Sequence, residues 1–516
     1  MAYRLEAFSG VGLDEAFLRL VIDEHTSAVV PRLERFWTYY RNPIEPVGLA
    51  GAGGRVRHRL GQERGLPARL TGGVGLGLGA DDRAAMRREV VIENDIAWRV
   101  HSMVDLMFGK PVMLLSTARE EGRRRVIERL LDAVWEASGG IALFQDLALL
   151  GHVHGHVDLL LRTDGLTRLR GSASATRAGG VPPTLDDEID EGRIADLAES
   201  VRIEVIEPTR GIPVLNPSDY RKLNLFVIHF ERELNEVEAR TGVRGMLSGR
   251  FGRSMAGLTR RRSTLTELIS GDHRQVYEDD RLIEDGPVLF TRGRVPVVHI
   301  QNLSQPFRYG GLGEVEQMIP LQDELNTRLS DRASRVTMQS FKMYLAKGLD
   351  GFEKVPVGPG QIWSTDNPEA EIQSFGGDAA SPSEESHIEQ IREALDKVSA
   401  VPPLASGVVR AKIGNLSSAN ALKITLIGAL SKTARKRVTY GGGISRLSRL
   451  ILTAMDEAGV FLTDERDRGV KVQWPDPLPD DVREQVAAAR AKVDLGVPSE
   501  RVLAELGYPP TDPGVT

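Results

Sequence analysis

Residues 401–455 restrict the folding of this 516-residue chain most, because they contain nine basic side chains and no acidic one. The apolar spacing predicts a long helix from about 418 to 459. On that helix Lys432 meets Arg435 and Lys436 at the three- and four-residue spacings where like charges repel. The compensating charge must therefore come from acids elsewhere in the chain, from another subunit or from a bound polyanion. The nine bases are Arg410, Lys412, Lys423, Lys432, Arg435, Lys436, Arg437, Arg446 and Arg449.

An acidic segment comes directly before the basic one. Residues 366–397 contain nine acids and two bases. Part of this segment is predicted to be helical, from Ser383 to the residue before Pro402 and Pro403. Its carboxylates are candidate partners for the basic helix, because opposite charges attract strongly wherever water is excluded.

The other patterns predict an α+β protein of about three domains. Apolar spacing predicts helices over 13–41, 84–110, 119–149 and 311–344, and two short helices after 480. Strand-like segments are expected at 152–164, 201–207 and 224–232, and short strands and turns between 345 and 382. Gly441, Gly442 and Gly443 lie in the middle of the basic helix. Each costs about 1 kcal/mol relative to alanine, so we expect a break or kink there.

Residues 46–80 are rich in glycine and arginine, and Glu63 is their only acid. This composition predicts a flexible surface loop, or alternatively an arm that becomes ordered on a partner.

Several classes of chemistry lack their sequence signatures. The chain has no cysteine, which excludes disulfides and thiolate zinc sites. It has no GxxxxGK[ST], GxSxG or HExxH motif, so we expect no catalytic residues and no cofactor. No apolar run of about 18 residues and no signal peptide is present, so no membrane association is expected. The formal net charge of −6 argues against tight binding of nucleic acid over the whole surface.

Three histidines, His152, His154 and His156, alternate in the segment expected to be a strand. A strand would place all three on one face, where they could hold a transition metal. Only Asp158 offers a nearby carboxylate, and most histidines in strands pack or form hydrogen bonds without metal. The sequence therefore predicts no metal site.

Three segments, in this order, resemble the siphovirus-type portal proteins of tailed bacteriophages. Residues 295–331 resemble the family's "VPVV-x-hydrophobic-x-N" strand and the "G-x-x-x-x-E-x-x-I-x-L-x-D-x-x-N-x-x-x-S-D" helix that follows it. Residues 414–430, GNLSSANALKITLIGAL, resemble the opening of the family's long internal helix, with one extra residue before Ala421. Residues 472–481, VQWPDPLPDD, resemble the strand and acidic turn after that helix.

This resemblance implies a portal fold and a ring of twelve subunits at one capsid vertex, through which double-stranded DNA passes. The fold combines a mixed α/β wing, a helical stem, a small α/β clip, a long kinked wing helix and a small helical crown. The implied regions are a wing over 1–310, a first stem helix over 311–344, a clip over 345–382, a second stem helix over 383–402, a tunnel loop over 403–416, a wing helix and strand over 417–478 and a crown over 479–516.

The resemblance also implies functional residues. Arg410 and Lys412, with Val408, Val409 and Asn415, would face DNA in the tunnel loop and touch its backbone without reading sequence. Lys354, Trp363, Asp366, Glu369 and Glu371 would lie in the clip. Lys432, Arg435, Lys436 and Arg437 would lie between subunits.

The implied partners are the large terminase (the packaging ATPase), a head-completion or adaptor protein, and the major capsid and scaffolding proteins. The protein would therefore occur in the virion and, during assembly, in the host cytoplasm. Two alternatives remain at this stage: another ring-shaped phage adaptor, and a metal-dependent nucleic-acid-processing enzyme that uses the histidine trio.

Overall fold

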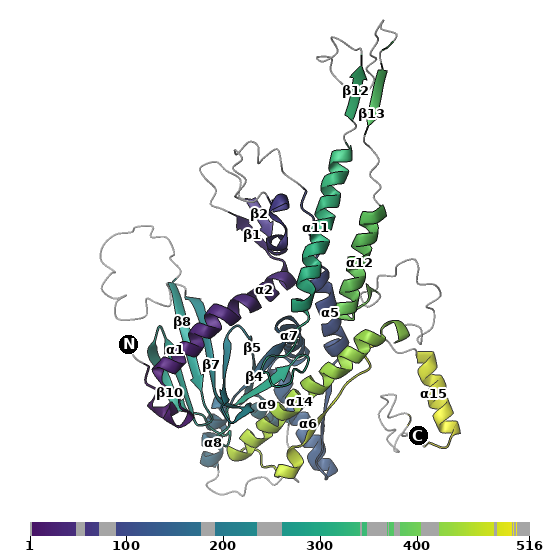
Figure 1. The fold of residues 1–516 in the computed structure, drawn as a ribbon. Coiled ribbons are helices and arrows are strands. Elements are labelled where there is room, and N and C mark those ends of the chain that lie inside the picture. Colours follow the sequence, from purple (N-terminus) through teal and green to yellow (C-terminus); the bar gives the residue numbers. More distant parts are fainter. Residues whose placement is uncertain are drawn as a thin grey trace, which may run out of the picture. The chain divides into compact units, whose positions relative to one another are not determined.

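The structure is a computed structural model, and it divides into two compact units (Figure 1). The first unit comprises Met1–Phe36, Arg99–Val315 and Val401–Thr516, and the second comprises Trp37–Trp98 and Glu316–Ala400. The residues that the structure describes are 3–47, 57–71, 89–176, 191–234, 261–340, 343–347, 369, 371–375, 382–403, 423–478, 482–497, 499 and 502.

A three-stranded antiparallel sheet lies at the centre of the first unit. Its strands are β4 (His156–Arg162), β5 (Arg202–Ile206) and β11 (Val297–Gln301), in the order β11-β4-β5. The middle strand β4 is buried over five consecutive residues, as expected for a strand that is covered on both faces. The same core contains residues of α6 (Glu121–Ala137), α7 (Gly140–His154), α9 (Glu191–Glu199) and α14 (Ile427–Glu457).

A five-stranded antiparallel sheet forms a second layer of this unit. Leu225, Val227 and Leu268 of the sheet pack against Phe8 and Leu18 near the N-terminus. The strand order is β10-β9-β8-β7-β6, and the strands are β6 (Gly211–Asn216), β7 (Asp219–Leu234), β8 (Arg261–Ile269), β9 (His273–Glu278) and β10 (Arg281–Pro287).

The N-terminal segment consists of consecutive helical turns. It contains η1 (Glu6–Val11), α1 (Glu15–Glu24), the π-helical turn η2 (His25–Val29) and α2 (Val30–Arg41). Asp14 caps α1 by accepting a hydrogen bond of 2.7 Å from the Phe17 amide. The predicted helix over 13–41 is thereby confirmed.

Shorter elements complete the first unit. β3 (Met113–Ser116) pairs with β14 (Val470–Gln473), and the remaining elements are α8 (Asp164–Thr176), η6 (Glu465–Arg468), α15 (Val482–Asp494) and, from Arg99 on, α5 (Asp95–Phe108). The single helix expected over 119–149 is two helices, because Gly139 and Gly140 adopt positive φ angles of 127° and 57° between α6 and α7. Within the described ranges, no helix has the length and apolarity needed to cross a membrane.

The helix α14 runs without interruption through Gly441, Gly442 and Gly443, so the predicted break is wrong (Figure 1). A Cβ atom at Gly443 would lie 2.3 Å from Cγ1 of Ile300 on β11, and one at Gly441 would lie 3.4 Å from Nε1 of Trp474. Gly443 therefore lets the helix approach the central sheet closely. The packing that this approach permits offsets the low helix propensity of glycine.

The second unit contains two of the expected long helices, α11 (Val315–Ser340) and α12 (Pro382–Ser399). The first is shorter than the predicted 311–344, because the chain is already in a strand at Met343. That strand, β12 (Met343–Lys347), pairs antiparallel with β13 (Glu371–Phe375), in agreement with the short strands expected between 345 and 382.

The glycine- and arginine-rich segment is partly regular in structure. It contains β2 (Arg57–Leu60), which pairs with β1 (Ile44–Val47), followed by η3 (Gly61–Gly65) and α3 (Ala68–Thr71). The only acid of the segment, Glu63, accepts a hydrogen bond of 2.8 Å from the Leu60 amide. The prediction of a flexible loop is therefore wrong for 57–71, while residues 48–56 and 72–80 lie outside the described part of the chain.

Candidate functional site

Glu314 supplies the acid that the basic helix requires. Lys432 and Lys436 lie one turn apart on α14 and are both buried, and both point to the carboxylate of Glu314. Lys432 contacts Oε2, and Nζ of Lys436 lies 2.6 Å from Oε1. A single carboxylate from the segment just before α11 therefore holds two buried cations of the first unit.

Burial and charge act against each other in this cluster. Burial alone would raise the pKa of Glu314, but Lys436 and Lys432 outweigh it and hold the pKa at about 2. Burial lowers the pKa of Lys436 to about 8, although Glu314 favours its charged form. His152 lies beside the cluster, and burial together with the charge of Lys436 lowers its pKa to about 3, so the imidazole is neutral.

The segment that carries Glu314 is fixed by its backbone to the turn between α7 and β4. The Glu314 amide donates to the His152 carbonyl at 2.7 Å, and the Asn302 amide donates to the Gly155 carbonyl at 2.9 Å. A Cβ atom at Gly155, where φ is 95°, would lie 2.4 Å from the Gly311 carbonyl oxygen. Glycine is therefore required where the two backbones meet, and the position of Glu314 follows from that contact.

The three histidines do not share one face of a strand, so that expectation is wrong. His152 and His154 belong to the last turn of α7, and only His156 lies on β4. The ring of His152 forms a hydrogen bond with the Ala148 carbonyl one turn earlier. Among the described residues, no group of three histidine or acidic side chains could hold a metal ion. The trio therefore does not form the metal site that the enzyme hypothesis used.

Asp158 belongs to a separate polar cluster on the central sheet. Its Oδ1 accepts hydrogen bonds from the Tyr309 hydroxyl at 2.6 Å and from Nδ1 of His299 at 2.8 Å. The rings of His299 and Tyr309 stack with 3.7 Å between their centroids. Burial would raise the pKa of Asp158, but His299 outweighs it and the pKa lies below its ordinary value. The cluster fastens the segment 302–314 to β4 and β11 at a second point.

The other bases of α14 have different surroundings. Arg437 donates to the Leu106 carbonyl at 3.1 Å, and its guanidinium lies over the Trp474 ring at 5.2 Å. Arg435 is exposed. Because Lys432 and Lys436 are buried within their own subunit, the prediction that these two lie between subunits is wrong. For Arg435 a position between subunits stays a prediction. Arg437 already has partners in its own chain.

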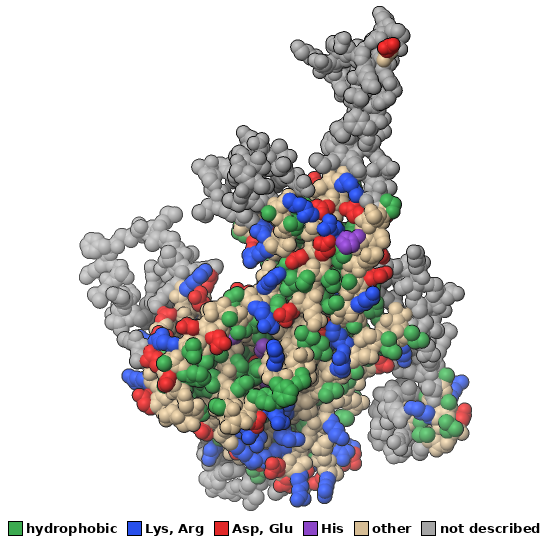
Figure 2. Space-filling view, in the orientation of Figure 1, with side chains coloured by type: hydrophobic (Ala, Val, Ile, Leu, Met, Phe, Trp, Pro, Cys, Tyr) green, Lys and Arg blue, Asp and Glu red, His purple; other side chains and the backbone are tan. Residues whose placement is uncertain are grey.

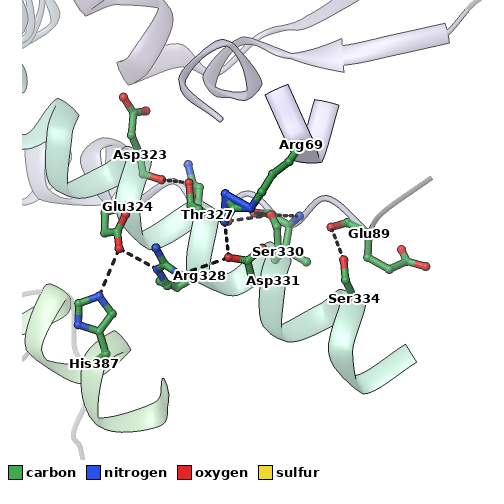
Figure 3. A network of polar contacts seen from close by, with 12 residues as sticks. Arg69, Glu89, Asp323, Glu324, Thr327, Arg328, Ser330, Asp331, Ser334 and His387 are labelled. Atoms are coloured by element: carbon green, nitrogen blue, oxygen red, sulfur yellow. Dashed lines mark hydrogen bonds and ion pairs between the residues drawn. The ribbon is translucent and has the colours of Figure 1, made fainter. Parts of the chain in front are cut away.

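Two acids of the segment 366–397, Glu384 and Glu385, pair with bases of α11. In the second unit Arg335 contacts Glu384, and Arg332 lies 3.9 Å from Glu385. Figure 3 shows Oε1 of Glu324 between Arg328 of the same helix, at 2.7 Å, and His387 of α12, at 3.2 Å. These partly exposed pairs contribute about 0–1 kcal/mol each, so they set the register of the two helices more than their stability.

A buried network of amide side chains fixes α11 to the rest of the second unit. Asn326 donates to Oε1 of Gln62 at 2.9 Å, and Gln322 donates to Oδ1 of Asn326 at 3.0 Å. The Glu93 amide also donates to Oδ1 of Asn326, at 3.0 Å. Gln62, Gln322 and Asn326 have no exposed surface. Because these polar atoms are satisfied inside the protein, the network specifies one way of packing this helix.

The sequence was also compared with known proteins. It matches the family described as "Phage portal protein, SPP1 Gp6-like" over residues 22–508. The chain belongs to the phage portal protein family. No curated protein matches it.

Solved structures with a similar fold come from particles of a gene transfer agent. One chain is from the "Neck of empty GTA particle computed with C6 symmetry", with 14% identity, a TM-score of 0.41 and coverage of 80% of this chain and 90% of that chain. Another is from the "Neck of native GTA particle computed with C12 symmetry", with 14% identity, a TM-score of 0.40 and coverage of 81% and 90%.

Most of the site residues expected for a portal protein lie outside the described part of the chain. These are Val408, Val409, Arg410, Lys412 and Asn415 of the tunnel loop, and Lys354, Trp363 and Asp366 of the clip. Of the other clip residues, Glu369 is exposed and Glu371 begins β13. These assignments remain predictions.

The residue that sequence reasoning missed is Glu314. It lies 118 positions before Lys432, so no local spacing connects the two. One signal was available, because Glu314 is the only acid in the otherwise glycine-rich stretch 310–314 and directly precedes an amphipathic helix.

Proposed function

We propose that twelve copies of this chain form a ring at one vertex of a phage capsid. Double-stranded DNA would enter the head through this ring during packaging and leave through it at ejection. The observation that carries this proposal is the family match over residues 22–508, which covers most of the chain. The protein would act as a structural channel and a docking platform, and the energy for packaging would come from a separate ATPase.

The elements of the two units suit different regions of the ring. The helices α11 and α12, connected by the ion pairs described above, suit the stem, and the β12–β13 pair suits the clip that meets the packaging motor. Residues 1–310 and 417–478 suit the wing, and 479–516 suit the crown. The buried pairing of Glu314 with Lys432 and Lys436 would join the base of the first stem helix to the long wing helix.

The segment 403–416 suits the tunnel loop at the narrowest part of the channel. Arg410 and Lys412 would touch phosphates there, and contacts with the backbone carry no sequence information. Few such contacts are expected, because each neutralised phosphate adds salt-dependent affinity and would slow the movement of DNA.

The proposed partners are the large terminase, a head-completion or adaptor protein, and the major capsid and scaffolding proteins. The mature location would be the capsid vertex of the virion, with assembly in the host cytoplasm. No covalent chemistry is assigned to the chain.

The test is the assembly state of the purified full-length chain. Native mass measurement should give a closed oligomer with a mass near twelve times 56.6 kDa, and electron microscopy should show rings with a central hole. A chain that remains monomeric at high concentration overturns the proposal. A ring that never co-purifies with a packaging ATPase, and is not needed for packaging, would indicate another adaptor.

A further inference from the structure

One face of α14 is exposed along most of the helix and carries no acid. The exposed positions recur at intervals of three and four residues, as one face of a helix requires. We call this set the basic face of α14. It consists of Ile427, Ser431, Arg435, Val438, Gly442, Arg446 and Arg449.

The basic face combines apolar and positive side chains in a way that favours a partner. Ile427 is 63% exposed and Val438 is 75% exposed. Figure 2 shows hydrophobic and basic side chains next to one another in the region where Figure 1 draws α14. Apolar residues with arginines among them are typical of surfaces that become buried on association. A partner for this face must bring carboxylates, because the face has none.

Such carboxylates lie on α6. Glu128, Asp132 and Glu136 follow one another at four-residue intervals, so they project from one face of that helix. Arg125 and Arg129 lie on the same side and pair with Glu121 and Glu191, and Oε1 of Glu128 accepts a hydrogen bond of 2.8 Å from the Ser116 amide. We call this set the acidic face of α6. Among the ion pairs of the described residues, none involves these three carboxylates. Burial of the carboxyl group and the charges of Glu128 and Glu136 raise the pKa of Asp132 to about 6, as expected for acids without a counter-charge.

The two faces point away from each other on one subunit. Both helices contribute buried residues to one core, and the indole Nε1 of Trp135 on α6 lies 3.4 Å from Oγ of Ser448 on α14. Because each helix turns its buried side toward the other, the two exposed faces cannot meet within one chain. They can meet between two copies. Pairing of two different surfaces is heterologous, and it forms a ring where the rotation between successive copies closes.

We propose that the basic face of α14 binds the acidic face of α6 on the neighbouring copy of this chain. The proposal rests on the proposed ring and identifies the surfaces that close it. Arg435 and Arg449 supply the charges, since neither takes part in the buried cluster around Glu314. Val438, in the middle of the basic face, and Ile427, at its N-terminal end, supply apolar area to the contact.

The test exchanges the charges of the two faces in the full-length chain. One variant carries Arg435→Glu and Arg449→Glu, a second carries Asp132→Lys and Glu136→Lys, and a third combines all four substitutions. Arg281→Glu, an exposed position on β10, is the control for charge reversal alone. Arg435→Gln with Arg449→Gln is a milder version, which stays informative if the reversed variant does not fold. Circular dichroism checks the fold, and native mass measurement gives the fraction of rings.

Each double reversal should raise the concentration needed for ring formation by about tenfold or more, and the fourfold variant should recover rings. The neutral variant should give an intermediate effect, and Arg281→Glu should behave as wild type. Rings that form normally in both double reversals overturn the proposal, as does a fourfold variant without recovery, because the faces are then not partners. A wild-type chain that never forms rings contradicts the proposed function instead, so the two failures are distinguishable.

Discussion

Nζ of Lys436 lies 2.6 Å from Oε1 of Glu314, and Lys432, one helical turn earlier, contacts the other oxygen of the same carboxylate. All three side chains are buried. Two positive charges therefore share one negative charge inside the first unit, and the carboxylate holds the segment 302–314 against the middle of α14. A buried ion pair contributes little net stability compared with apolar packing, but its loss leaves an uncompensated charge.

Replacing Glu314 by glutamine should therefore destabilise the protein strongly. We expect the free energy of unfolding to fall by about 3–5 kcal/mol, measured by chemical denaturation, because Lys432 and Lys436 lose their counter-charge. Glu199→Gln, at an exposed position of α9, should change it by less than about 0.5 kcal/mol. Adding Lys432→Met and Lys436→Met to Glu314→Gln should recover most of the loss. A Glu314→Gln protein as stable as wild type would contradict this account.

Gly442 and Gly443 of α14 should respond to alanine in opposite directions. Gly443→Ala places a Cβ atom 2.3 Å from Cγ1 of Ile300, so we expect a loss of about 1–3 kcal/mol in the free energy of unfolding. Gly442→Ala meets no atom within 4 Å and should gain up to about 1 kcal/mol from helix propensity. Ile300→Ala should reduce the penalty of Gly443→Ala in a double-mutant cycle. Equal effects at the two glycines would show that close packing is not the reason for Gly443.

The sequence predicted this helix because its apolar spacing is regular, but the break expected at the glycines did not occur. Propensity describes an isolated helix, and the contact of Gly443 with Ile300 is a tertiary interaction between segments 143 residues apart. The need for a compensating acid was predictable from nine bases without a carboxylate. Which acid compensates them was not predictable, because only the folded chain brings Glu314 to Lys432.

The strand predicted to begin at His152 was wrong for a different reason. Residues 152–156 alternate histidine with valine and glycine, and over so few residues this alternation does not distinguish the end of a buried helix from the start of a strand. The structure extends α7 to His154 and begins β4 two residues later, after Gly155 at φ 95°. One glycine with a positive φ therefore changed the assignment of two candidate metal ligands.

Acid should destabilise the fold through the buried histidines. Burial lowers the pKa values of His152 and His154 to about 3, so both imidazoles are neutral in the folded chain near pH 5. An unfolded chain binds a proton at each below about pH 6.5. Stability is therefore complete above pH 6.5 and falls as the pH falls toward 3, by about 1.4 kcal/mol per pH unit for each group.

The measurement is the free energy of unfolding against pH for wild type and His152→Gln. Between pH 6 and 4 the slope of the variant should be smaller than that of wild type by the amount that corresponds to one bound proton, about 1.4 kcal/mol per pH unit. An identical slope for His152→Gln and wild type would show that His152 is not neutral in the fold.

The amide network of the second unit should be as sensitive as an apolar core. Asn326→Leu removes the donor to Gln62 and the acceptor of the Glu93 amide. Because buried polar atoms without partners cost about 1–3 kcal/mol each, we expect a loss in that range or somewhat above it by chemical denaturation. Gln317→Leu, at an exposed position of the same helix, is the matched control. If both variants were equally stable, the amide network would not be what stabilises the packing of this helix.

The tunnel-loop assignment can be separated from ring assembly. Replacing Arg410 and Lys412 by alanine should leave the rings intact, because these residues are proposed to contact DNA and not a neighbouring subunit. Packaging or retention of DNA should change, because two phosphate contacts per subunit are lost and contacts of this kind weaken steeply with salt. Lys222→Ala with Arg281→Ala, two exposed bases on the five-stranded sheet, is the control and should affect neither property. If the rings themselves fail to form without Arg410 and Lys412, those residues belong to the subunit interface, and the channel must contact DNA through other side chains.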